Sequence, residues 1–277
     1  MTTPYFESKG IDAPRLCAEL LLSHVLGCSR IDLYTGFENP VADDRLSAFR
    51  ELVRRRSARE PIQHLTGRTE FWSLPIHCDA RALVPRPETE LVVQAVLDYV
   101  NGRDDPAIAD IGTGTGCIAA ALARELPNAS LVASDASAEA LELAAENFTA
   151  LDVADRVRLI EGDLAAPFVN EGLTGCFDVV ASNPPYIPDD EWASLQPEVR
   201  DHDPAQALRG GPDGLRIMDR LLRDTGPLLK PDGAMIMEIG VNQAERVQEM
   251  LGSTGWCASE ILPDGAGIQR VLIAKPA

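Results

Sequence analysis

The sequence predicts an α/β fold with a doubly wound, mostly parallel sheet, preceded by a small helical domain. From residue 106 onward, short apolar runs alternate with amphipathic segments of helical length. Such alternation places helices on both faces of a parallel sheet. Before residue 70, apolar residues recur mainly at helical spacing. We therefore expect three parts: a helical domain over 1–70, a β-hairpin linker over 71–86 and an α/β domain over 87–277.

In the first part, we expect helices over residues 11–27, 29–36 and 42–61. Asp12 can cap the first of them, Pro14 suits its first turn, and Gly27 can end it. Arg54, Arg55 and Arg56 are expected to form a solvated helix end, where cations are favourable. Contact with an acidic partner is the alternative reading of this basic run.

The second part, residues 70–90, changes to extended character and contains two prolines before a new helix, which indicates a hairpin. Pro87 and the acidic residues after it suit a helix start. The expected strands are 107–112, 130–135, 157–163, 177–185, 233–240, 257–263 and 269–275, and the expected helices are 87–100, 117–126, 138–151, 214–229 and 242–252.

Composition limits the possible classes of protein. No apolar run approaches the roughly 20 residues of a membrane helix, and the N-terminus lacks the layout of a signal peptide. We therefore expect a cytoplasmic protein without membrane association. The net charge is −18, and residues 1–75 are balanced with 10 basic and 10 acidic residues. An acidic α/β domain repels phosphate backbones, so direct binding to nucleic acid is not expected.

Cysteine and histidine spacing gives no indication of a metal site. The six cysteines are scattered without a CxxC pair, and the four histidines show no ligand spacing. Reduced, mostly buried thiols and no metal are the expectation. The Asp201-His202-Asp203 run could bind a cation, but a solvated loop is the preferred interpretation.

Polar motifs follow successive predicted strands, where ligands of such sheets bind. In "DIGTGTGC", Gly112, Gly114 and Gly116 permit a tight turn and close approach of a ligand. A dinucleotide fingerprint would place its third glycine at position 117, which is Cys117, so a nicotinamide-dependent oxidoreductase is disfavoured. No Gly-Lys-Ser/Thr follows either, which excludes a P-loop.

Two carboxylates stand at the next two strand ends. Asp135 can accept both hydrogen bonds of a ribose diol, or it can cap the following helix. Asp163 could likewise cap a helix. No basic residue beside the glycines is available to neutralise a pyrophosphate. A nucleoside without phosphate fits these residues best.

At these residues the sequence resembles the class I S-adenosylmethionine-dependent methyltransferases. Their glycine-rich motif matches residues 110–116, and their ribose-binding acid matches Asp135. The resemblance implies a Rossmann-like, seven-stranded sheet in which 269–275 inserts antiparallel. It also implies S-adenosyl-L-methionine as cofactor, released as S-adenosyl-L-homocysteine. The cofactor-binding residues would be Gly112, Thr113, Gly114, Thr115, Gly116, Asp135, Asn183 and, at the adenine, Asp163 and Leu164.

The stretch "SNPPY" supplies groups that suit methyl transfer to a planar nitrogen. Such a nitrogen is a poor nucleophile because its lone pair is delocalised, and acceptors for both N–H groups would hold and activate it. Asn183 offers a side-chain oxygen and Pro184 a backbone carbonyl. Pro185 stiffens the segment, and Tyr186 offers a ring for stacking. A rigid exit from a strand is the purely structural alternative. Adenine, guanine and glutamine acceptors remain open on this motif alone.

Two further stretches, "EPIQHLTGRTEFW" (60–72) and "LVPRPETE" (83–90), together with "NPPYIP" resemble the release factor glutamine methyltransferase (HemK/PrmC) family over nearly the whole chain. The resemblance implies that the acceptor is the glutamine of a Gly-Gly-Gln loop in peptide chain release factors, held partly by the helical domain. Arg86 and Glu88 would border the pocket, although Arg86 could instead pair with a carboxylate. Leu164 departs from relatives that carry an aromatic residue there.

Three other functions remain as alternatives. They are a ribosomal-protein glutamine methyltransferase, a nucleic-acid adenine or guanine N-methyltransferase, and a binding module that holds the cofactor without catalysis. The second would need a basic face or a target-recognition domain, and the chain shows neither. Intact Asn183 and Tyr186 argue against the third.

Overall fold

Two compact units make up the chain. The computed structural model describes the backbone of residues 1–277 and all side chains except those of 258 and 259. The helical unit comprises Met1–Arg68 and Gln196–His202, and the sheet unit comprises Thr69–Leu195 and Asp203–Ala277. Residues 196–202, which the sequence places inside the predicted 87–277 domain, therefore pack with the helical unit.

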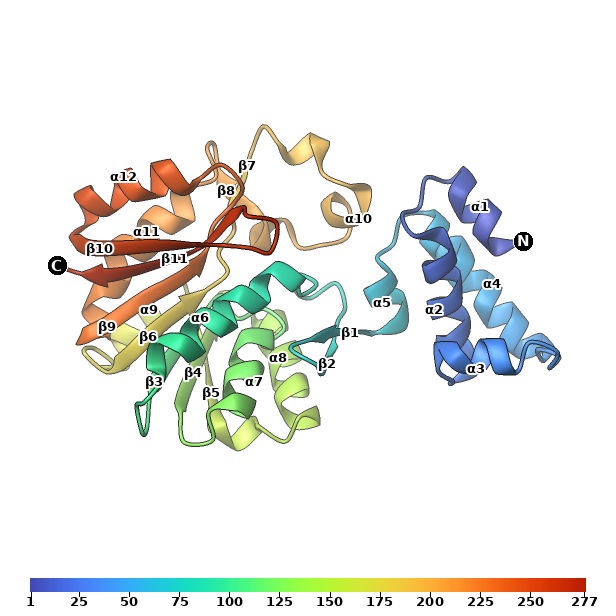
Figure 1. Ribbon diagram of the computed structural model, residues 1–277, viewed down its shortest axis with the longest axis horizontal. Coiled ribbons are helices and arrows are strands. Elements are labelled where there is room, and N and C mark those ends of the chain that lie inside the picture. Colours follow the sequence, from blue (N-terminus) through green and yellow to red (C-terminus); the bar gives the residue numbers. More distant parts are fainter. The chain divides into compact units, whose positions relative to one another are not determined.

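The helical unit is built around a small apolar core. Its buried residues include Phe6, Leu21 and Leu65. Helix α2 begins after Ala13, which adopts a left-handed conformation (φ 45°) and makes no side-chain cap, so the cap expected from Asp12 is wrong. The helices are α1 (Thr2–Ser8), α2 (Pro14–Leu26), α3 (Arg30–Thr35), α4 (Asp43–Ser57), α5 (Ile62–Thr66) and α10 (Pro197–Arg200) (Figure 1).

The arginines at the end of α4 differ from one another in environment. Arg54 is exposed and pairs with Glu51, as a solvated helix end predicts. Arg56 is buried and pairs with Glu198 at 2.9 Å, and Arg59 binds the same carboxylate at 2.7 Å. The expectation of solvation is thus wrong for Arg56, because its partner comes from a segment 142 residues away.

The sheet unit holds a seven-stranded sheet in the order β10-β11-β9-β6-β3-β4-β5 (Figure 1). β11 runs antiparallel between β9 and β10, as predicted for 269–275, and the pairs among β3, β4, β5, β6 and β9 are parallel. The strands are β3 (Ala107–Ile111), β4 (Ser130–Asp135), β5 (Val157–Glu161), β6 (Phe177–Ser182), β9 (Leu229–Glu238), β10 (Trp256–Pro263) and β11 (Gln269–Pro276), with a small pair β7 (Ile187–Pro188) and β8 (Arg209–Gly211).

Helices cover both faces of this sheet, which confirms the doubly wound architecture. Along β6, Val179 belongs to the core cluster on one face, whereas Phe177 and Val180 belong to the cluster on the other. Residues of α6 (Glu90–Val100), α7 (Cys117–Glu125) and α8 (Ala138–Ala150) fill the first cluster. Residues of α9 (Ala166–Asn170), α11 (Arg216–Thr225) and α12 (Ala244–Thr254) fill the second. Every residue of β6 is buried.

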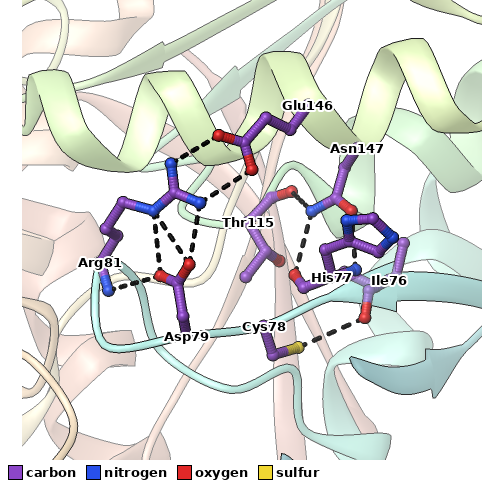
Figure 2. A network of polar contacts seen from close by, with 8 residues as sticks. All are labelled: Ile76, His77, Cys78, Asp79, Arg81, Thr115, Glu146 and Asn147. Carbon is purple, nitrogen blue, oxygen red and sulfur yellow. Dashed lines mark hydrogen bonds and ion pairs between the residues drawn. The ribbon is translucent and has the colours of Figure 1, made fainter. Parts of the chain in front are cut away.

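A hairpin of β1 (Arg68–Phe71) and β2 (Leu74–His77) precedes the sheet. Its two turn residues, Trp72 and Ser73, both have positive φ (53° and 58°), which matches the twist of a two-residue hairpin turn. The end of β2 is held to α8 by buried Asn147, whose amide bonds both the N–H and the C=O of His77 (Figure 2). Arg81 also pairs with Asp79 and with Glu146 of α8.

All six cysteines are free, but only Cys17, Cys78 and Cys117 are buried, so half rather than most of the thiols are inside. Among the described residues, no helix combines the length and apolar character needed to cross a bilayer.

Candidate active site

A cavity of about 200 Å³ opens at the carboxyl ends of β3, β4 and β6 in the sheet unit. Its walls come from the glycine-rich loop after β3, the ends of β4, β5 and β6, and the segment 81–89. The predicted site residues that line it are Gly112, Thr113, Gly114, Thr115, Asp135, Asp163, Leu164, Asn183 and Pro185. Gly116, Pro184 and Tyr186 are not part of this lining.

The glycines of the loop serve two purposes. Gly112 and Gly114 have positive φ (75° and 56°), and a Cβ added at Gly112 would meet no protein atom within 4 Å. The backbone at Gly112 therefore faces open space, and Gly114 leaves room for ordinary contact with Ala82 only. Gly116 (φ 80°) faces α8 instead, where an added Cβ would lie 2.6 Å from the Phe148 ring. Gly116 therefore has a packing role, and its contact with the cofactor stays a prediction.

Thr113 and Asp110 fix the base of the loop. The Thr113 hydroxyl donates to Asp110 Oδ2 at 2.6 Å, and the backbone N–H of Thr113 donates to the carbonyl of Ser134 on β4 at 2.8 Å. Asp110 is fully buried, and burial raises its pKa to about 7. Negative charge on this carboxyl therefore develops only near neutral pH.

Asp135 faces the loop rather than capping a helix. Its Oδ2 accepts from the Gly114 N–H at 2.9 Å, and its Oδ1 accepts from the Ser137 N–H at 3.0 Å. The cap of α8 is the Ser137 hydroxyl, which accepts from Ala140. Each carboxylate oxygen keeps a lone pair for a further donor, so Asp135 can accept from a diol.

Asp163 and Leu164 lie at the other side of the same cavity. Asp163 is exposed and pairs with Arg220 of α11 at 2.6 Å. Leu164 is half-buried, has a positive φ of 50° and packs against the second core cluster. An aliphatic surface therefore stands where a flat ring could pack.

Asn183 belongs to a chain of hydrogen bonds that leads into the core. Its Nδ2 donates to Thr89 Oγ1 at 2.9 Å, and the Thr89 hydroxyl donates to Glu238 Oε2 at 2.6 Å. Tyr186 donates its phenolic hydrogen to Glu238 Oε1 at 3.0 Å. Burial raises the pKa of Glu238, while the two hydroxyl donors and Arg270 lower it. One buried carboxyl group thus contacts both Thr89 and Tyr186.

Tyr186, whose ring is predicted to stack on the acceptor, is anchored at its hydroxyl. The ring is half-buried against the second core cluster, and its hydroxyl is used by Glu238. Gln243, the N-cap of α12, donates to the backbone carbonyl of Tyr186 at 2.9 Å. The side chain is held mainly from the protein interior.

Arg86 and Glu88 are both predicted to border the pocket, but in the structure they line different hollows. Arg86 lines the cavity and also pairs with Asp203 at 3.0 Å, so both interpretations of this arginine hold. Glu88 is exposed and lines a different hollow, so its predicted place at the pocket is wrong. Asp203 is buried, which overturns the expected solvated loop, and burial raises its pKa to about 6.

Thr89 and Glu238 were missed by sequence reasoning. Thr89 lies within "PRPETE", which was recognised without a role for the threonine. Glu238 ends the apolar run "GAMIME", and a carboxylate inside such a run was the available signal, since buried charges need partners. Among the described side chains, no group of three or more His, Cys, Asp or Glu residues is placed to hold a metal ion.

The lining fits S-adenosylmethionine as cofactor. Open backbone at Gly112 admits a ligand where any Cβ would project, Asp135 offers acceptors for a ribose, and Leu164 offers an apolar surface. The catalytic domain of hMettl16, solved in complex with an RNA hairpin, shares this fold with a TM-score of 0.59 at 16% identity, over 84% of this chain and 82% of that one. Fold and site together define a class I, Rossmann-like, S-adenosylmethionine-dependent methyltransferase.

Sequence comparison identifies the family. A model described as PrmC N-terminal domain matches residues 2–67, and one described as Methyltransferase small domain matches 88–195. The release factor glutamine methyltransferase of Rhodopirellula baltica is 41% identical over 285 residues, covering 100% of this chain and 94% of that protein. That of Chlorobaculum tepidum is 41% identical over 258 residues, covering 91% and 87%. The chain belongs to the release factor glutamine methyltransferase family.

Proposed function

We propose that this protein transfers a methyl group from S-adenosylmethionine to the side-chain amide nitrogen (N5) of the glutamine in the Gly-Gly-Gln loop of peptide chain release factors. The observation that carries the proposal is the fixed amide of Asn183. Its NH₂ group is engaged by Thr89, so its Oδ1 is left to accept from a substrate N–H. The names of the family members support the choice of protein substrate.

Catalysis by these residues is mainly positioning. When bound, S-adenosylmethionine supplies an electrophilic methyl group. Asn183 Oδ1 and the Pro184 carbonyl would accept the two N–H groups of the glutamine amide and hold its nitrogen in line with that methyl. Pro185 keeps the segment rigid, and Tyr186 braces it from the interior. The nitrogen becomes acidic as its new bond forms, so its proton can leave to water without a dedicated base.

The cofactor would be held by Gly112, Thr113, Gly114 and Thr115, by Asp135 at the ribose, and by Asp163 and Leu164 at the adenine. The helical unit would help to hold the release factor. The protein would act in the cytoplasm, where translation ends.

The test is incubation of the full chain with labelled S-adenosylmethionine and purified release factors, followed by mass spectrometry of the Gly-Gly-Gln peptide. Label on the glutamine side chain is the expected result. Label on a ribosomal protein or on RNA or DNA instead would favour the corresponding alternative acceptor.

Asn183→Ala is the matched variant for this experiment. It should reduce methyl transfer at least 100-fold while the Kd for S-adenosylmethionine stays within threefold, because the lost group contacts the acceptor. Substantial activity in this variant would refute the acceptor role of Asn183.

A further inference from the structure

A buried pair of side chains stands directly behind Asn183. Thr89 is 2% exposed and Glu238 is 1% exposed, and they come from the turn before α6 and from the end of β9. Thr89 touches the cavity, whereas Glu238 is not part of its lining. Burying two polar side chains in the protein interior costs free energy of folding unless their hydrogen bonds are satisfied.

The direction of each hydrogen bond follows from the chemistry of its partners. Glu238 accepts from the Tyr186 hydroxyl at Oε1 and from the Thr89 hydroxyl at Oε2, so the single hydroxyl hydrogen of Thr89 points toward Glu238. The Oγ1–Oε2 distance of 2.6 Å is that of a short O–H···O hydrogen bond. The oxygen of Thr89 can then only accept, and the group within reach is Asn183 at 2.9 Å.

This order decides which way the Asn183 amide faces. Its NH₂ must turn toward Thr89, and its oxygen must turn to the opposite side. In the reversed orientation, two oxygens would face each other across the Thr89 contact, and an NH₂ would confront the NH₂ of the acceptor. Only the observed orientation presents an acceptor to a substrate amide.

We infer that Thr89 and Glu238 are positioning residues that lock the side-chain amide of Asn183 with its oxygen toward the methyl acceptor. Glu238 also holds the hydroxyl of Tyr186 at 3.0 Å, so one carboxylate fixes both ends of the Asn183–Tyr186 segment. This inference rests on the proposed function. Thr89 and Glu238 would not contact the acceptor nitrogen themselves and would act only by orienting Asn183 and Tyr186.

Thr89→Val is the principal test, because valine keeps the shape and removes the hydroxyl. With the purified full chain, S-adenosylmethionine and a release factor, kcat should fall at least tenfold while the Kd for S-adenosylmethionine stays within twofold. Thr89→Ser restores a hydroxyl and should recover most of the lost activity. Thr225→Val is the matched control: Thr225 is equally buried but bonds the Leu221 carbonyl on α11, and this variant should keep wild-type kcat.

Glu238→Gln provides a second, independent variant, which replaces the carboxyl group by an amide of nearly the same size. A glutamine can present either an oxygen or an NH₂ to Thr89, so both orientations of Asn183 become accessible, and kcat should fall severalfold at unchanged cofactor affinity. This variant decides the matter if Thr89→Val proves unstable by thermal unfolding.

Wild-type kcat in either Thr89→Val or Glu238→Gln would overturn the inference, as would a Thr89→Ser variant as impaired as Thr89→Val. Absence of glutamine labelling by the wild-type protein is a different failure: it would remove the proposed function, and the positioning role with it.

Discussion

Gly112, Gly114 and Gly116 occupy every second position of one loop, yet their backbones face different neighbours. Gly112 faces space that a ligand can occupy, and the nearest atom to an added Cβ at Gly114 is Ala82 Cβ at 3.9 Å. Gly116 faces the Phe148 ring and Ala144 on α8. The spacing of these glycines therefore reflects ligand access at two positions and close helix packing at the third.

Gly116→Ala should destabilise the sheet unit by about 2–4 kcal/mol, since overpacking adds to the strain of a left-handed alanine. Urea unfolding measures this loss. Gly102→Ala is the control, because Gly102 has a similar φ of 83° but no atom within 4 Å of its added Cβ. It should cost about 1 kcal/mol. Equal losses in the two variants would show that the collision with Phe148 is relieved without cost.

The two carboxylates at the cavity should contribute unequally to cofactor binding. Asp135→Ala should weaken S-adenosylmethionine binding more than tenfold, or about 1.4 kcal/mol, because Asp135 both orders Gly114 and offers free lone pairs. Asp163→Ala should weaken binding by a smaller factor, since Asp163 is exposed and already pairs with Arg220. Isothermal titration measures both, with exposed Glu161→Ala on β5 as control. An unchanged Kd in Asp135→Ala would remove this residue from the site.

At the scale of elements, Asn147 joins three parts of the sheet unit. From α8 it bonds the N–H and C=O of His77 at the end of β2, and it donates to the Thr115 carbonyl in the glycine-rich loop at 2.9 Å (Figure 2). One buried amide thereby ties the hairpin to the loop that lines the cavity.

Asn147→Leu keeps the volume and leaves three backbone groups without partners, each worth about 1–3 kcal/mol when buried. The free energy of unfolding should fall by at least ~3 kcal/mol in urea titration. Thr149→Val, on the exposed side of α8, is the control and should lie within ~0.5 kcal/mol of wild type. A loss below ~1 kcal/mol in Asn147→Leu would mean that water replaces the amide.

Local sequence predicted the elements better than it predicted the partners of charged side chains. The alternating apolar runs sufficed for β3 to β6, because burial on both faces leaves a strong pattern. The predicted solvation of Arg56 and Asp203 is wrong because their partners, Glu198 and Arg86, lie far along the chain, and the bond of Tyr186 to Glu238 was unpredictable for the same reason. The motif around Asn183 indicated a site, but Thr89 could be recognised only once β9 brought Glu238 beside it.

At the scale of the whole molecule, the acidic character of the chain extends into its interior. The net charge is −18, and Asp110, Asp203 and Glu238 are all buried with raised pKa values. Burial is the largest cause in each case, because a carboxylate loses hydration in the core. Carboxyl groups with lowered pKa values, such as Glu19 at about 2, stabilise the folded state fully once the pH exceeds their unfolded pKa, so they add no pH dependence above about pH 5.

These raised pKa values predict a stability that falls as pH rises. Between pH 3.8 and about 7, the unfolded chain releases the proton of Asp110 while the folded protein retains it, so ionisation favours unfolding. A shift of this size corresponds to about 4 kcal/mol at full ionisation. Asp203, with a pKa of about 6, acts in the same direction over a narrower window.

Thermal unfolding without cofactor should therefore give a higher Tm at pH 5.5 than at pH 8. Asp110→Asn cannot ionise and keeps an oxygen for the Thr113 hydroxyl, so its Tm should vary less over this range. Asp98→Asn, on the exposed face of α6, is the control and should keep the wild-type slope. If Asp110→Asn kept that slope as well, the dependence would arise from repulsion among surface carboxylates, which charge-neutralising salt would then reduce.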